Sequence, residues 1–261
     1  MIHLKNIIYC LLIGNIFLLV FSCNGYKIQT YESTNQLIND KINPNEFSDV
    51  NLSLYRDSLE NEMDEVINQA NRNLDVGSPE GLLGNFITDL SIDRVKRINS
   101  FPTQPDFCVL NNGGFRTSIN KGPVTRGNVF EVMPFDNYLV VLKINGDELI
   151  ELLNYIKDKS LLQGSRKAGV PISGMRLKIK ENKISRCFIN NKEIDYNNSY
   201  YVLTTDYLAN GGDKMTFFKN CKEKHDTGLL LRDAIINYIK DIAYNNINID
   251  ASLDGRVEIN K

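Results

Sequence analysis

The sequence predicts an α+β fold, a single domain over residues 51–261 with a mixed sheet and flanking helices. Three observations predict it. Apolar residues recur at helical spacing in the first third of this region, short apolar runs with strand-like alternation fill its middle, and another helical stripe precedes a short terminal apolar run. No internal repeat or linker divides these segments, so we expect one core.

Two amphipathic helices are expected at the start of the domain. The first is one long helix from Leu52 to Leu74, whose apolar residues fall on one face. The second runs to about Ile98 and begins at Ser78-Pro79-Glu80, which supplies a capping hydroxyl, a first-turn proline and an acidic first turn. Inside it, Gly84-Asn85 is unfavourable for a helix, which indicates close packing against a neighbour or nothing in particular.

Strands are expected where apolar and β-branched residues cluster between turn residues. Phe107–Leu110 is one short strand, and Tyr138–Ile144 is another that leads into a helix starting at Gly146-Asp147. The next segments predict an antiparallel meander over Met175–Ile179, Ile184–Ile189 and Tyr200–Thr204. A final helix is expected over Leu229–Ile242 and a terminal strand over Arg256–Ile259.

Composition and charge limit the classes of function. The chain has 261 residues, of which 42% are hydrophobic, enough for a sizeable core. Its 30 basic and 32 acidic residues give a net charge of −2, so no bulk attraction to nucleic acid is expected. A small anionic ligand needs only one or two well-placed arginines and stays compatible with this balance.

Residues 1–22 predict an export signal. His3 and Lys5 precede the apolar run Ile7–Phe21, which is shorter than the roughly 20 residues of a spanning helix. Its end, Leu19–Cys23, resembles the lipobox of bacterial lipoproteins and implies lipidation of Cys23. We therefore expect an exported protein anchored by lipid in the bacterial cell envelope, in the periplasm or at the outer membrane or cell surface. A cleaved signal with an incidental cysteine is the alternative.

Residues 23–50 are rich in Asn, Ser, Thr, Lys and Asp and predict a flexible tether between lipid and domain. Beyond it, the spacing of Cys108, Cys187 and Cys221 matches no zinc pattern, and the first two sit in apolar runs where thiols behave as small buried hydrophobes. His225 stands in a polar run and is expected to be a solvated surface histidine. No metal site is expected in this chain.

Two polar loops directly follow expected strands. The first is Asn111–Gly114, with Arg116 close behind, and the second is Thr205–Asp213. Their glycines tolerate positive φ and so allow sharp turns. Such loops line one cleft if their strands are neighbours, and Phe135 and Tyr207 can then face each other. Each loop alone is also typical of an ordinary turn.

Several motifs together resemble the C-terminal, substrate-binding domain of bacterial and animal 5′-nucleotidases. The resemblance runs from about residue 52 to the end of the chain, and the motifs agree in type, order and spacing. They are LLGNFITDL at 82–90, LNNGGFRTSI at 110–119, Gly122–Thr125, VMPFDN at 132–137, Gly146–Leu153, PISGMR at 171–176 and TTDYLANGGD at 204–213.

The resemblance implies a site that holds the nucleoside part of a nucleotide, with the base stacked between Phe135 and Tyr207. The family usually has phenylalanine at the second position. By motif matching, Asn111 bonds the base, Arg116 reaches toward phosphate and ribose, and Asp213 accepts from the ribose hydroxyls. The alternative is that both rings are plain core aromatics. The expected set is completed by Asn112, Gly113, Gly114, Gly211 and Gly212.

Two departures from the family matter for activity. Members with nucleotidase activity carry another arginine shortly before the GN of the second helix, where this chain has residues 75–80, so an anionic group would be held less firmly. The family's metallophosphoesterase domain, which binds two metal ions and does the hydrolysis, has no counterpart here. We therefore expect no catalytic residue in this chain and expect the divalent metals in a partner chain.

The resulting hypothesis is a membrane-tethered nucleotide-recognition half of a split 5′-nucleotidase, with a separate metallophosphoesterase polypeptide as its partner. The helix from Leu52 to Leu74 is a candidate partner-facing surface, because in the resembling enzymes this segment connects the two domains. One alternative is a nucleoside-binding module of the cell envelope without hydrolysis. Another is a degenerate structural protein with no ligand.

Overall fold

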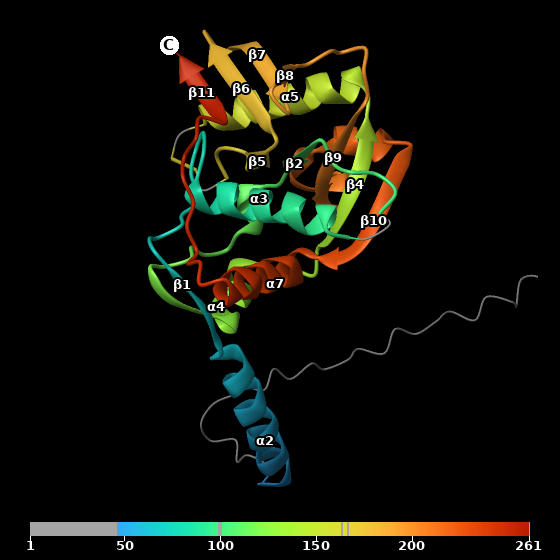
Figure 1. Ribbon diagram of the computed structural model, residues 1–261. Coiled ribbons are helices and arrows are strands. Elements are labelled where there is room, and N and C mark those ends of the chain that lie inside the picture. The colour runs from blue at the N-terminus through green and yellow to red at the C-terminus, as the bar shows by residue number, and fades with distance from the viewer. Residues whose placement is uncertain (1–45, 99–100, 163, 166, 261) are drawn as a thin grey trace, which may run out of the picture. The chain divides into compact units, whose positions relative to one another are not determined.

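The computed structural model describes residues 46–98, 101–162, 164–165 and 167–260. The chain divides into two compact units, Met1–Asp49 and Val50–Lys261, and all three sheets belong to the second (Figure 1). The predicted signal, the lipid site Cys23 and residues 23–45 of the predicted tether lie outside the described residues. No helix within the described ranges is long and apolar enough to cross a membrane.

The predicted long helix from Leu52 to Leu74 is wrong at both ends. Helix α2 spans Glu46–Met63, so it begins inside the predicted tether and stops eleven residues early. Strand β1 (Val66–Ala70) follows and pairs antiparallel with β3 (Gly122–Thr125).

Asn68 in β1 explains why the helical spacing does not decide this segment. Its side chain is buried, and its amide donates to the carbonyl oxygens of Ile239 and Ile247 at 3.1 Å each. These bonds to residues distant in the chain, together with the β-branched pair Val66-Ile67, favour an extended backbone over continued helix.

A five-stranded mixed sheet forms the centre of the second unit. Its strand order is β10-β4-β9-β2-β5, in which β2 and β9 run parallel and all other neighbours run antiparallel. The mixed sheet predicted from the sequence is thereby confirmed. The strands are β2 (Phe107–Val109), β4 (Tyr138–Ile144), β5 (Ile172–Ser173), β9 (Tyr200–Thr205) and β10 (Glu223–Leu230).

Both faces of this sheet are covered by hydrophobic core. Along β4, Leu139 and Val141 pack into one core cluster, and Val140 and Leu142 pack into the other. Helices α3 (Leu82–Lys96) and α7 (Leu231–Tyr244) cover the first face, and α5 (Gly146–Leu161) covers the second (Figure 1). A strand buried on both sides needs consecutive apolar residues, and Leu139–Leu142 supply them, which explains why this strand could be predicted.

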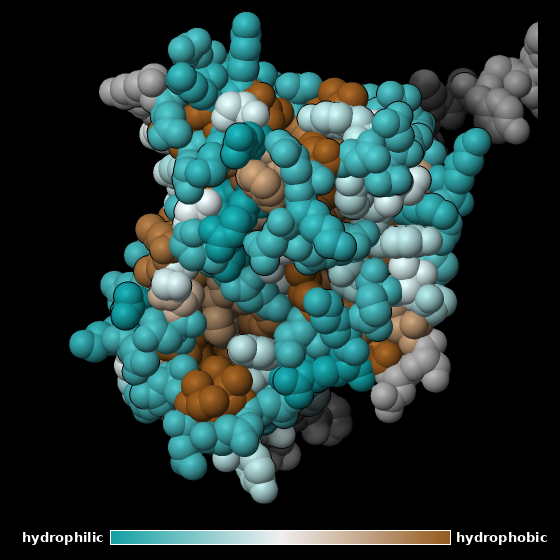
Figure 2. Space-filling view, turned by 45° about the horizontal axis from the view of Figure 1, so that its top comes forward, coloured by the Kyte–Doolittle hydropathy of each residue, from teal (hydrophilic) through white to brown (hydrophobic). Residues whose placement is uncertain are grey.

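The outer surface contrasts with these two core clusters. On the face shown in Figure 2, hydrophilic residues predominate and hydrophobic ones lie in small separate patches. Scattered exposed apolar residues are normal on a globular domain. The apolar content of the sequence is therefore explained mainly by the two clusters on either side of the central sheet.

A second sheet has the order β11-β6-β7-β8. Its strands are β6 (Met175–Lys180), β7 (Lys183–Ile189), β8 (Lys192–Glu193) and β11 (Val257–Asn260). The hairpin turns fall at Glu181-Asn182 and Asn190-Asn191, all four residues having positive φ. The predicted meander is correct for β6 and β7 but wrong for Tyr200–Thr204, which lies in the central sheet as β9.

Helix α3 begins later than the sequence predicts. Leu82 is its first residue and Gly81 its N-cap, while the Ser78 hydroxyl donates to the Ser160 carbonyl instead of capping the helix. A Cβ added at Gly84 would lie 3.0 Å from Pro171. Of the two interpretations of Gly84, close packing is therefore the correct one.

Candidate functional site

Strands β2, β9 and β4 bring three connecting segments together at one end of the central sheet. β2 and β9 run parallel, so their carboxyl ends lie together, and the register pairs Thr205 at the end of β9 with Leu139 at the start of β4. The turn after β2 (η1, Asn112–Gly114), the helix after β9 (α6, Asp206–Ala209) and the segment before β4 therefore meet. Sheet edges of this kind are where ligands bind in many α/β folds.

A cavity of about 250 Å³ opens at this edge, and we call it the strand-end cavity. It contains most of the residues that the sequence predicts and two that it does not, Asn137 and Lys167. The lining residues are Asn111, Gly113, Gly114, Arg116, Phe135, Asn137, Lys167, Tyr207 and Asp213. The predicted residues Asn112, Gly211 and Gly212 do not line it.

Phe135 and Tyr207 are the aromatic walls of the strand-end cavity. Their side chains stay 43% and 49% exposed, although each is attached to a segment held against the core. The alternative that both rings are plain core aromatics is therefore wrong. An exposed flat ring beside a cavity is a surface on which a planar ligand can stack.

The segment that carries Phe135 is anchored by the start of α7. The Arg232 guanidinium donates to the Met133 carbonyl at 3.4 Å and to the Asp136 carboxylate, and the Leu231 amide donates to the Asn137 carbonyl at 2.9 Å. These bonds fix the backbone on either side of Phe135, so the ring is presented by a rigid turn. Arg232 itself stacks over the ring of Phe130.

Tyr207 rests on a glycine. A Cβ added at Gly212 would lie 2.5 Å from the Tyr207 ring, so only glycine leaves room for the ring there. The Tyr207 hydroxyl also accepts a hydrogen bond of 3.2 Å from the Asp213 backbone amide. Gly212 thus supports the ring from outside the cavity, which explains why a predicted site residue does not line it.

Asp206 joins the two aromatic segments and was not predicted. One oxygen of its carboxylate accepts from the backbone amides of Tyr207 at 2.7 Å and of Tyr138 at 3.2 Å. Tyr138 begins β4, three residues after Phe135. The sequence signal for this role is an Asp directly after a strand, which is typical of local capping and does not identify a distant partner.

The Asn111–Gly114 turn needs its glycines for space. Neither Gly113 nor Gly114 has positive φ, so the predicted use of their backbone freedom is wrong. A Cβ at Gly114 would lie 3.1 Å from the Asn111 amide oxygen, and one at Gly113 would lie 3.4 Å from its nitrogen. The Asn111 side chain therefore lies across both glycines, and its amide donates to Asp213 at 3.2 Å.

Asp213 closes the cavity from the opposite loop. Its backbone is left-handed, with φ of 48°, and its carboxylate lies 3.6 Å from the Lys159 ammonium group. The Tyr155 hydroxyl donates to the Asp213 carbonyl at 2.9 Å. Burial and the nearby Asp213 raise the pKa of Tyr155, so the hydroxyl remains a donor over the physiological range.

The cysteines and His225 lie outside this site. Cys108 and Cys187 are buried, as predicted, and burial raises the pKa of Cys108 well above its usual value and that of Cys187 to about 12. His225 lies in the edge strand β10 with its side chain 25% exposed, 3.0 Å from Glu223 and edge-on to Phe101, so it is a surface histidine that is partly packed and not fully solvated. Within the described ranges, no group of His, Cys, Asp or Glu could hold a metal ion, so those residues do not fit a two-metal centre.

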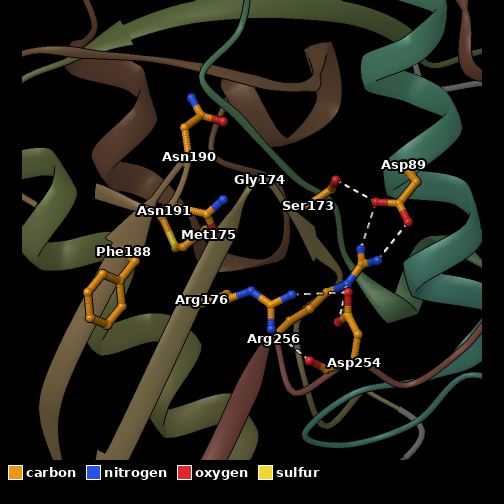
Figure 3. A pocket seen from close by; sticks show the side chains of 10 residues that line it. All are labelled: Asp89, Ser173, Gly174, Met175, Arg176, Phe188, Asn190, Asn191, Asp254 and Arg256. Carbon is orange, nitrogen blue, oxygen red and sulfur yellow. Dashed lines mark hydrogen bonds and ion pairs between the residues drawn. The ribbon is translucent and has the colours of Figure 1, made fainter. Parts of the chain in front are cut away.

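A larger cavity, of about 340 Å³, lies at the junction of the two sheets, and we call it the Arg256 cavity (Figure 3). Arg256 is only 10% exposed and donates to both oxygens of Asp89, at 2.8 and 2.6 Å, and to Asp254 at 2.9 Å. Arg176 also bonds Asp254, through its carbonyl at 2.7 Å. No sequence pattern predicts this cluster, because its members come from distant segments.

Comparison with known proteins agrees with this fold. A family model described as 5′-nucleotidase, C-terminal domain matches residues 62–220. A 5′-nucleotidase of Vibrio parahaemolyticus is 31% identical over 131 residues, which cover 50% of this chain and 21% of the relative. An apyrase of Tabanus yao is 27% identical over 177 residues, covering 60% of this chain and 31% of that protein.

Among solved structures, the 5′-nucleotidase precursor of Thermus thermophilus is similar, with a TM-score of 0.66 and 28% identity. The match covers 82% of this chain and 43% of that one, so this chain spans less than half the length of the Thermus protein. The family model matches more than half of the residues and the similar structure shares the fold. The chain belongs to the 5′-nucleotidase C-terminal domain family.

Proposed function

We propose that this chain is the nucleotide-recognition half of a 5′-nucleotidase and that it holds the base of a nucleotide between Phe135 and Tyr207. The observation that carries the proposal is the placement of these two half-exposed rings, from segments far apart in the sequence, on one cavity. Stacking of this kind is worth about 1–3 kcal/mol per base and tolerates different bases.

The polar residues of the strand-end cavity suit the rest of a nucleotide. Asn137 follows Phe135 closely, and its amide can donate to and accept from the edge of a stacked base. Asn111 and Asp213 already bond each other and present the remaining acceptor positions of the carboxylate to ribose hydroxyls. Arg116 is exposed at the cavity, where a guanidinium binds phosphate oxygens well.

The hydrolytic step is assigned to a separate metallophosphoesterase polypeptide. Phosphate ester cleavage at neutral pH commonly uses metal-activated water, and the strand-end cavity supplies stacking, amide and cationic groups that bind and orient. The two chains would then divide the work between orientation and chemistry. The names of the relatives, 5′-nucleotidase and apyrase, support this class of reaction.

Purified chain incubated with AMP and Mn²⁺ or Zn²⁺ tests the division of labour. We expect no phosphate release above the rate of AMP alone, and we expect AMP binding in a calorimetric titration of the same sample. Metal-dependent turnover by the pure chain would contradict the division of labour. Absence of binding would contradict nucleotide recognition.

Helix α2 is the proposed contact with the partner. Leu52, Tyr55 and Leu59 recur at helical spacing and are exposed. Asp57, Glu60 and Glu62 of the same helix are acidic, so a partner with basic residues beside an apolar groove fits it. Tyr55→Glu should abolish co-purification of the metallophosphoesterase from native membranes, and Tyr244→Glu, at a largely exposed tyrosine of α7, should not.

We also propose that lipid on Cys23 holds the chain at the cell envelope. Two or more acyl chains give stable anchoring, whereas one does not. Metabolic labelling with a palmitate analogue should mark the wild-type chain and leave Cys23→Ser unlabelled and in the soluble fraction. Equal labelling of both would contradict the proposal.

A further inference from the structure

The strand-end cavity carries more positive charge than its walls compensate. Its charged lining residues are Arg116, Lys167 and Asp213. The Asp213 carboxylate is engaged by the Asn111 amide at 3.2 Å and lies 3.6 Å from the ammonium group of Lys159, which stands outside the lining. The charge of Lys159 therefore compensates that of Asp213, and no lining residue compensates the positive charges of Arg116 and Lys167.

Among the residues that the structure describes, neither of these two cations has a partner of opposite charge. Within the described ranges, no carboxylate lies within 4.0 Å of the Arg116 guanidinium or the Lys167 ammonium group. Both side chains are exposed and both line the same cavity. Two like charges held at one cavity repel each other, and a bound anion removes that repulsion.

Lys167 is held at the cavity by the turn that forms its floor. The buried amide of Asn112 donates to the carbonyl of Ala168 at 2.6 Å and to that of Gly77 at 3.0 Å. The Lys167 amide donates to Ser165 at 3.2 Å. Asn112 does not line the cavity, but it fixes the residue after Lys167 and so positions the lysine.

The stem of Lys167 lies along Gly113. A Cβ added at Gly113 would meet the Lys167 side chain at 3.7 and 3.8 Å, which is ordinary contact. The methylene groups thus run beside the turn, and the ammonium group stays at the cavity. Gly113 therefore leaves room for the stem of Lys167 as well as for the side chain of Asn111.

We propose that Lys167 is a second phosphate-binding residue of this cavity beside Arg116, so that its charge favours a nucleoside phosphate over the uncharged nucleoside. This inference rests on the proposed nucleotide recognition and deepens it. Arg116 supplies a planar fork and Lys167 a point charge, which together suit a phosphate with two negative charges. It also assigns Asn112 as a positioning residue for Lys167.

The test is a calorimetric titration of the full chain with AMP and with adenosine at low and moderate salt. For wild type we expect AMP to bind about tenfold more tightly than adenosine, with the difference shrinking as salt screens the charges. Lys167→Gln should weaken AMP binding about three- to tenfold and leave adenosine binding unchanged. Lys167→Arg should restore most of the AMP affinity.

Lys192→Gln, at an exposed lysine of β8 that does not line the cavity, is the matched control and should change neither affinity. If Lys167→Gln weakens both ligands equally or neither, the phosphate assignment is wrong while nucleotide recognition stands. If wild type binds neither AMP nor adenosine, the proposed function itself is wrong.

Discussion

The Arg256 cavity and the strand-end cavity contain similar residues but balance their charges differently. In the Arg256 cavity, two arginines are matched by Asp89 and Asp254, and each guanidinium is bonded within the protein. In the strand-end cavity, Arg116 and Lys167 are exposed at the lining without a carboxylate partner among the described residues. The larger cavity is thus electrostatically complete, and the smaller one is not.

This difference indicates that the Arg256 cavity stabilises the fold, whereas the strand-end cavity is the one that we propose binds a ligand. Arg256 links the C-terminal segment to Asp89 on α3 and to the Ile172 carbonyl of β5, so it joins parts of the fold. At the strand-end cavity, hydrogen bonds instead fix the two segments that carry the exposed rings of Phe135 and Tyr207. Cavity size alone would favour the Arg256 cavity as the binding site, whereas charge balance and exposed rings favour the strand-end cavity that we propose.

The largest effect should come from breaking the Arg256 cavity. Arg256→Met removes the guanidinium bonds to the Ile172 carbonyl and to Asp89, which retain the hydroxyls of Thr88 and Ser173 as donors, and should lower the free energy of unfolding by about 2–3 kcal/mol. Urea denaturation measures it. Arg176→Met, at an exposed arginine of the same cavity, is the control and should cost below about 1 kcal/mol. Equal free energies of unfolding for Arg256→Met and Arg176→Met would contradict a structural role for Arg256.

Gly212→Ala should weaken AMP binding with little loss of stability. The added methyl group would meet the Tyr207 ring at 2.5 Å and push it into the cavity, so part of the stacking energy is lost. We expect about 1–2 kcal/mol of lost binding free energy. Unchanged affinity together with an unmoved ring in a structure of the variant would show that Gly212 does not support Tyr207.

Asp206→Ala should misalign both aromatic segments. It removes the acceptor shared by the Tyr138 and Tyr207 amides and should weaken AMP binding by about 1 kcal/mol. Asp206→Asn keeps an acceptor oxygen and should retain most of the affinity. Hydrogen exchange of the two amides, which should quicken in the alanine variant alone, checks the cause. Identical exchange in both variants would contradict it.

Tyr207→Phe should have the smallest effect. The stacking surface remains, and only the bond from the Asp213 amide to the hydroxyl is lost. We expect about 0.5 kcal/mol of weaker AMP binding, at the low end for a partly exposed hydrogen bond. Exchange of the Asp213 amide should quicken. A loss as large as that of Tyr207→Ala would mean that the hydroxyl, and not the ring, contacts the ligand.

The sequence predicts well what depends on local pattern. The run YLVVLKI predicts β4 at its observed limits, because its central residues, Leu139–Leu142, are buried on both faces and are all apolar. The strand before Asn111 and the loop around Tyr207 are recognisable because polar turn residues follow apolar runs abruptly. Their meeting at one cavity follows once β2 and β9 are known to be parallel neighbours.

The sequence fails where distant partners decide. The apolar residues of β1 have helical spacing, but hydrogen bonds from the Asn68 side chain to the carbonyls of Ile239 and Ile247 favour a strand. The first four residues of β10, Glu223–Asp226, are polar and mostly charged, and the edge position that tolerates them is set by pairing with β4. Lys167 is placed at the cavity by contacts between distant segments, such as the bond from Asn112 to the Ala168 carbonyl, which no motif predicts.

The most direct test of nucleotide recognition is a titration of AMP into wild type, Phe135→Ala, Tyr207→Ala and the double variant, with Tyr244→Ala as an exposed aromatic control. Each site variant should lose about 1–3 kcal/mol of binding free energy, the control should lose none, and the AMP base protons should show upfield ring-current shifts in wild type. AMP bound with equal affinity by the wild type and the double variant would contradict the account.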